Sequence, residues 1–180
     1  VTADEGVTAT VEVTVAESAI SEVKNSVAVV GAEDNSTAFW GAFSDDFNVP
    51  SGETKWITFT NYSSLAGNWN NYVVVLRKAD ATEYGVVRAD NYGWGAGYDG
   101  NANLITSGGQ TDWAAWLATM NGAKVTVYVT NCGNGTADVQ AVMQGTDGST
   151  SIQYYLGITT VDPADLNFAL TVDGSHLVFE

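Results

Sequence analysis

The sequence predicts an all-β fold, a two-sheet antiparallel β-sandwich of jelly-roll type. Apolar and polar residues alternate along most of the chain, which is typical of half-buried strands. Gly, Asn and Asp turn signals separate these alternating segments at intervals of about ten residues. A parallel α/β sheet would need crossover helices, and few segments have a helical period. The 180 residues suit one such sandwich, which can bury well over half of its surface.

The first predicted strand covers residues 7–15, where Val and Ala alternate with Thr and Glu. Eight further strands are predicted at residues 55–60, 72–77, 84–90, 124–131, 137–144, 151–158, 167–172 and 176–179. Asp147-Gly148 and Asp173-Gly174 each separate two of these strands by a few residues. Both dipeptides are therefore interpreted as hairpin turns.

Two segments favour a helix. From Ser18 to Val30, apolar residues recur at roughly helical spacing after Ser18, which can serve as an N-cap. Asp112 to Met120 reads as a short helix with an acidic cap, and it is the stronger of the two predictions. The segment 92–112 between the strands is rich in Gly and Asn and is predicted to be a long functional loop.

The alternation also assigns side chains to the core or to the surface. In 124–131 the valines face the core, which leaves Tyr128 outside between two threonines. The same rule leaves Gln140 outside in 137–144, and Arg88 and Asp90 outside in 84–90.

Charge and composition exclude several partners. The 21 Asp and Glu residues against 6 Lys and Arg give a formal charge of −15, so nucleic acid and anionic lipid would both be repelled. No apolar run approaches the ~20 residues of a membrane helix. With Cys132 and His176 as the single Cys and His, an intrachain disulfide and Cys-based or His-rich metal sites are excluded.

The tryptophans carry most of the functional signal, because several lie at element ends or in loops beside Gly, Asn and Asp. An indole ring can stack on the C–H face of a sugar while amides, carboxylates and guanidinium groups bind its hydroxyls. Trp56 is interpreted as structural, since Trp is highly buried on average, and Trp113 and Trp116 are left open between core and ligand. The predicted ligand-binding residues are Trp40, Trp69, Asn70, Arg88, Asp90, Asn91, Trp94, Tyr128 and Gln140. Arg88 and Asp90 have an alternative interpretation as a surface ion pair, which would contribute little to stability.

Catalysis and metal binding have less support. A glycosidase needs two positioned carboxylates, and Glu53, Glu83 and Glu180 are the Glu residues beyond the first loop. His176 is interpreted as a structural or exposed turn residue rather than a lyase acid. Asp45-Asp46 and Asp99-Gly100-Asn101 offer oxygen ligands to calcium but match no full EF-hand loop. Solvated acidic loops and no cofactor are therefore expected.

Residues 36–180 resemble the non-catalytic β-sandwich carbohydrate-binding modules of secreted bacterial polysaccharide-degrading enzymes. The segments that carry this resemblance are Phe39–Ser44, Asn68–Asn71, Arg88–Gly95 and a hairpin expected at Leu170–Phe179. Val1–Val15 is similar to the closing strands of bacterial immunoglobulin-like domains. The expected organisation is thus a neighbour's tail or recruited edge strand over residues 1–17 and a glycan-binding domain over 18–180, both part of a larger multidomain chain.

The resemblance implies an extracellular location, secreted or on the cell surface, and non-catalytic binding of a neutral polysaccharide. A soluble β-glucan is the preferred ligand, and the module would bring an attached enzyme or a cell surface to it. Two alternatives remain: a structural or adhesive module of a bacterial surface protein, and, less favoured, a sandwich-fold glycan hydrolase or lyase.

Overall fold

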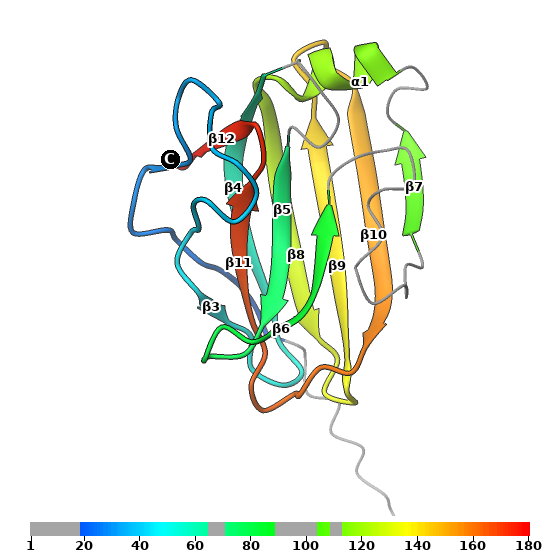
Figure 1. Cartoon of the computed structure of the whole chain (residues 1–180). Coiled ribbons are helices and arrows are strands. Elements are labelled where there is room, and N and C mark those ends of the chain that lie inside the picture. The colour runs from blue at the N-terminus through cyan, green and yellow to red at the C-terminus, as the bar shows by residue number, and fades with distance from the viewer. Residues whose placement is uncertain (1–18, 65–70, 89–103, 109–112) are drawn as a thin grey trace, which may run out of the picture.

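The all-β prediction is confirmed by a computed structural model, which describes residues 19–64, 71–88, 104–108 and 113–180. Two antiparallel sheets, one of eight strands and one of four, pack against each other. Figure 1 shows the small sheet in front of the large one, with the helix α1 (Trp113–Met120) at one end of the sandwich. The predicted helix at Asp112–Met120 is confirmed over these eight residues.

The large sheet has the strand order β2-β12-β4-β8-β9-β10-β7, and β1 pairs with β4 outside this path. Its strands are β1 (Ile20–Glu22), β2 (Val29–Val30), β4 (Thr54–Ser63), β7 (Leu104–Gly108), β8 (Ala123–Asn131), β9 (Thr136–Gln144), β10 (Thr150–Thr159) and β12 (Ser175–Val178). The β1–β4 pair is parallel, and the other pairs of this sheet are antiparallel.

The small sheet has the order β3-β11-β5-β6 and is antiparallel throughout. Its strands are β3 (Phe47–Asn48), β5 (Tyr72–Arg77), β6 (Glu83–Arg88) and β11 (Asn167–Val172). The alternating segments predicted from residue 55 onward are therefore strands, with ends that shift by at most three residues. The jelly-roll connectivity stays a prediction.

The core fills the space between the two sheets and follows the predicted alternation. Val125, Val127 and Val129 of β8 are fully buried, as are alternate residues of β9. Phe59 of β4 and Phe168 of β11 enter from opposite sheets and are at most 1% exposed. Fully burying such a side chain stabilises the fold by about 1.5–3 kcal/mol. The residues between these positions must therefore point away from the core.

The helix predicted at Ser18–Val30 is wrong over the described part of that segment. Ile20–Glu22 forms β1 beside β4, and Val29–Val30 forms β2 beside β12. The Val23 N–H donates to the Trp56 carbonyl at 2.8 Å, so the segment takes its hydrogen bonds from the sheet. Its valines are β-branched, which favours a strand wherever a sheet edge offers partners.

The hairpin predicted at Asp173-Gly174 is also wrong. This turn leads from β11 in the small sheet to β12 in the large sheet, so the two strands do not pair with each other. Its dipeptide signals a change of direction, and Gly174 takes the positive φ of 60° that such a turn favours. The signal carries no information on which sheet receives the next strand.

The Asp147-Gly148 hairpin is confirmed, because β9 and β10 pair in antiparallel fashion around it. Within the loop predicted at 92–112, Leu104–Gly108 instead forms β7 and pairs with β10. The strand predicted at 7–15 and the domain boundary at residue 17 lie outside the described residues.

Candidate functional site

An aromatic pair lies on the outer face of the large sheet, the face turned away from the small sheet. Trp56 of β4 and Tyr128 of β8 stand directly opposite each other in the register. Their ring centroids are 6.3 Å apart and the rings are tilted by 37°. Both residues are half-buried, whereas Ile57 beside Trp56 and both valines beside Tyr128 are buried. The core packing of these strands therefore holds both rings outward.

The aromatic pair belongs to a polar row that crosses four strands. Glu22 of β1 pairs with Trp56, and Gln140 of β9 pairs with Tyr128. Neighbouring strands lie about 4.8 Å apart, so the Gln140 amide can reach a ligand that rests on the rings. Gln140 is half-buried.

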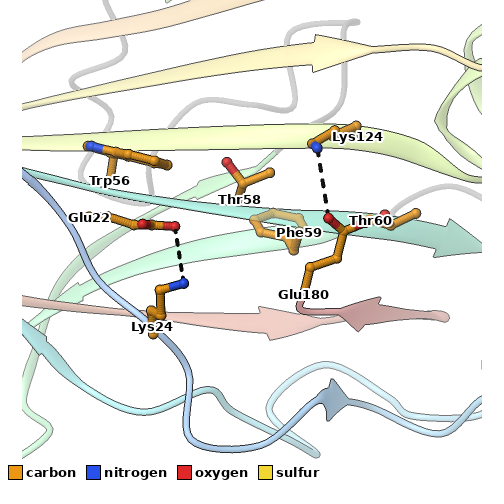
Figure 2. A pocket seen from close by; sticks show the side chains of 8 residues that line it. All are labelled: Glu22, Lys24, Trp56, Thr58, Phe59, Thr60, Lys124 and Glu180. Carbon is orange, nitrogen blue, oxygen red and sulfur yellow. Dashed lines mark ion pairs between the residues drawn. The ribbon is translucent and has the colours of Figure 1, made fainter.

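Two hollows flank the aromatic pair. The first has a volume of about 440 Å³ and is shown in Figure 2; it is lined by Glu22, Lys24, Trp56, Thr58, Phe59, Thr60, Lys124 and Glu180. The second, of about 380 Å³, is lined by Ile20, Thr54, Tyr128, Thr130, Asp138, Val139 and Gln140. We call the aromatic pair, Gln140 and the two hollows the outer-face site.

Threonines supply fixed hydroxyls along this site. The Oγ1 atoms of Thr58 and Thr126 lie 2.9 Å apart across β4 and β8, and those of Thr54 and Thr130 lie 2.8 Å apart. In each pair one hydroxyl donates to the other, so an acceptor lone pair and a donor remain to be used. The face thus offers neutral hydrogen-bonding groups beside the rings.

The charges of the first hollow balance one another. Lys24 Nζ lies 3.9 Å from Glu22, and Lys124 Nζ lies 4.0 Å from Glu180, as the dashed lines of Figure 2 mark. All four side chains are well exposed, so these pairs contribute little to stability. They do make the hollow neutral in sum on a chain with a formal charge of −15.

Of the residues predicted to bind ligand, the structure brings Tyr128 and Gln140 together at this site. Trp40 and Arg88 lie on the opposite side of the sandwich, over the outer face of the small sheet. There Phe39 and Phe43 pack on a second apolar cluster formed by Val73, Val75 and Val86. The predicted set therefore does not form one platform. Trp69, Asn70, Asp90, Asn91 and Trp94 lie outside the described residues.

Two arginines contact the aromatic rings that pack on the small-sheet cluster. The Trp40 ring stacks on Phe43 with centroids 5.4 Å apart, and the Arg88 guanidinium lies 5.8 Å from the Phe39 ring centroid. Arg77 binds Asp46 through Nε at 2.6 Å and also lies over Phe43. These contacts fasten the segment around residues 39–46 to β5 and β6.

The predicted acidic clusters are engaged in other contacts where the structure describes them. Asp46 pairs with Arg77, and Asp45 accepts hydrogen bonds from the backbone N–H and hydroxyl of Ser26. Among the described residues, no three or more His, Cys, Asp and Glu side chains are grouped so that they could hold a metal ion. Asp99-Gly100-Asn101 lies outside the described residues.

The sequence analysis interprets Trp56 as a structural residue and therefore misses it as a member of this site. The signal was present in the chain, because Trp56 has the opposite parity to Ile57 and Phe59, both of which are buried. His176, expected as a structural or turn residue, lies on β12 and contacts Tyr62 of β4. Within the described ranges, no helix is long and apolar enough to span a membrane.

Comparisons of the chain with protein-family models, with curated proteins and with solved structures found no match.

Proposed function

We propose that this chain is a non-catalytic module that binds a neutral polysaccharide at the outer-face site, with a soluble β-glucan as the preferred ligand. The observation that carries the proposal is the outward Trp56–Tyr128 pair, which stands in one row with Gln140 and has a hollow on each side. We propose in addition that the module acts outside the cell, secreted or on the cell surface. There it would bring an attached enzyme or the cell itself to the glycan.

The chemistry of the row suits a sugar. An aromatic face stacks on the C–H face of a pyranose ring, and amide and hydroxyl groups bind its hydroxyls. At this site the rings come from Trp56 and Tyr128, the amide from Gln140 and the hydroxyls from Thr58 and Thr130. The 37° tilt between the rings favours one flexible chain over a flat crystalline surface.

The electrostatics favour an uncharged ligand. A polyanion would be repelled by a chain that carries 21 acidic and 6 basic residues. The two lysines of the first hollow are each already paired with a carboxylate. A neutral glycan needs no counter-charge and can use the polar row as it stands.

Affinity electrophoresis in gels that contain β-glucan, xyloglucan, xylan or mannan tests the proposal. We expect the wild-type chain to be retarded by at least one of these polysaccharides. Trp56→Ala and Tyr128→Ala should lose most of the retardation, because each stacked ring contributes on the order of 1–3 kcal/mol by analogy with stacking on bases. Incubation with the same polysaccharides should release no new reducing ends, as befits a binding module.

Trp40→Ala is the matched control, since it removes an exposed aromatic from the opposite face. It should retain the retardation of the wild type. The proposal fails if no neutral polysaccharide retards the wild-type chain. The placement of the site fails if Trp56→Ala and Trp40→Ala migrate alike. Trp69 and Trp94 stay predicted contacts, and their Ala variants belong in the same gels.

A further inference from the structure

A second aromatic pair lies on the same face of the large sheet, farther along β4. Phe59, Asn61 and Ser63 are buried, so Thr60 and Tyr62 point outward with Trp56 and Thr58. Tyr62 is 37% exposed and is one of the few large side chains of the described residues with so much free surface. Tyr62 lies six positions after Trp56, a span of about 20 Å at ~3.3 Å per residue.

Tyr62 is held in place by its cross-strand neighbour. His176 of β12 pairs with Tyr62 in the register, and the two rings stack with centroids 4.9 Å apart and an angle of 14° between them. The His176 Nδ1 atom is hydrogen-bonded to Asn35 Oδ1 at 2.8 Å. The hydrogen bond to Asn35 therefore fixes the orientation of the imidazole, and the stacked imidazole in turn restricts the Tyr62 ring.

The surface between the two aromatic pairs is continuous. The first hollow begins at Trp56 and runs past Thr58 to Thr60, the last outward residue before Tyr62. Lys124 of β8 and Glu180, which follows β12, reach toward each other across this stretch (Figure 2) and form an exposed ion pair at 4.0 Å, which costs little to open. The same hollow that begins at the first aromatic pair therefore ends next to the second.

We propose that the glycan site extends along β4 to a second aromatic station at Tyr62 and His176. This inference rests on the proposed function and specifies its ligand as a linear neutral chain long enough to reach both stations. Such a chain lies along β4 with one part on Trp56 and Tyr128 and a later part on Tyr62. Its affinity therefore rises with chain length until both stations are filled, because the second contact is made within an already bound chain.

Isothermal titration with β-glucan oligosaccharides of increasing length tests the extension. We expect Tyr62→Ala to weaken the binding of long oligosaccharides about tenfold and to leave the binding of short ones unchanged. Trp56→Ala should weaken the binding of both. Tyr62→Phe keeps the ring and its stacking on His176, and it should bind long chains almost as the wild type does.

The outcomes separate the two proposals. If Tyr62→Ala binds long and short oligosaccharides as the wild type does, the extension is overturned while the binding function stands. If the wild type binds no oligosaccharide and is retarded by no polysaccharide, both are overturned. Because Tyr62 is exposed and lies in a strand, Tyr62→Thr provides a second ring-free variant with good strand propensity, and it should behave as Tyr62→Ala does.

Discussion

The backbone at Trp40 adopts the left-handed conformation, with φ at 66°. It occupies the turn that the Gly41 N–H closes on the Ala38 carbonyl at 2.8 Å. A residue with a Cβ atom is strained in this region by roughly 1–2 kcal/mol, and Gly is the usual occupant. The stacking of the indole on Phe39 and Phe43 offsets this strain and keeps the ring over the small sheet.

This strain predicts an inverted order of stability for two Trp40 variants. Trp40→Gly and Trp40→Ala both lose the indole, but only alanine keeps a Cβ atom in the left-handed backbone. The glycine variant should therefore be more stable by about 1 kcal/mol, although alanine is usually the more stable of the two. Urea midpoints measure the difference. An alanine variant of equal or greater stability would show that the turn does not impose this backbone conformation.

At the scale of elements, β4 joins the core to the proposed site. Its outward residues form the outer-face site, and its inward Asn61 is fully buried. The Asn61 amide donates to Asn71 Oδ1 at 2.8 Å and to the Met120 carbonyl at 3.0 Å, and its Oδ1 accepts from the Tyr72 N–H at 3.1 Å. One side chain thus links β4 to the start of β5 and to the end of α1.

Asn61→Ala should therefore destabilise the fold by about 3 kcal/mol, because it leaves several buried polar groups without their partner at a cost of roughly 1–3 kcal/mol each. Asn48→Ala is the matched control, since Asn48 is exposed and its two amide contacts are both 3.3 Å long. The control should lose less than about 1 kcal/mol. Equal losses in chemical denaturation would contradict the role given to Asn61.

The alternation of residues was sufficient to predict the strands that supply the core. It placed Tyr128 and Gln140 on the outer face, because the buried apolar residues of β8 and β9 alternate with them. Sequence could not predict β1 and β7, whose short segments become strands only where β4 and β10 offer hydrogen-bonding partners.

The site was predictable only in part. Parity within a strand tells which face of a sheet a residue occupies, but it does not tell which strands stand side by side. Trp56 and Tyr128 are 72 positions apart in the sequence and meet only through the pairing of β4 with β8. For the same reason, Trp40 and Arg88 could not be assigned to the opposite face before the order of the strands was known.

Across the molecule, a charge of −15 and a first hollow that is neutral in sum have separate consequences. Salt screens repulsion among the acidic residues, so the thermal midpoint of unfolding should rise with ionic strength.

The binding of a neutral glycan releases no counterions. Its affinity should therefore change by less than about twofold from low salt to several hundred millimolar sodium chloride. Titrations at the two ionic strengths check this. A steep loss of affinity with salt would instead indicate a charged ligand.

We have proposed that a neutral glycan lies on the outer face of the large sheet. Backbone amide shifts in an NMR titration of the isotopically labelled chain with a β-glucan oligosaccharide test this placement residue by residue. We predict that the largest shift changes occur at residues 54–62 of β4, 124–130 of β8 and 138–142 of β9. Shift changes confined to the small-sheet cluster around Trp40, or to any other surface away from β4, β8 and β9, would contradict the claim.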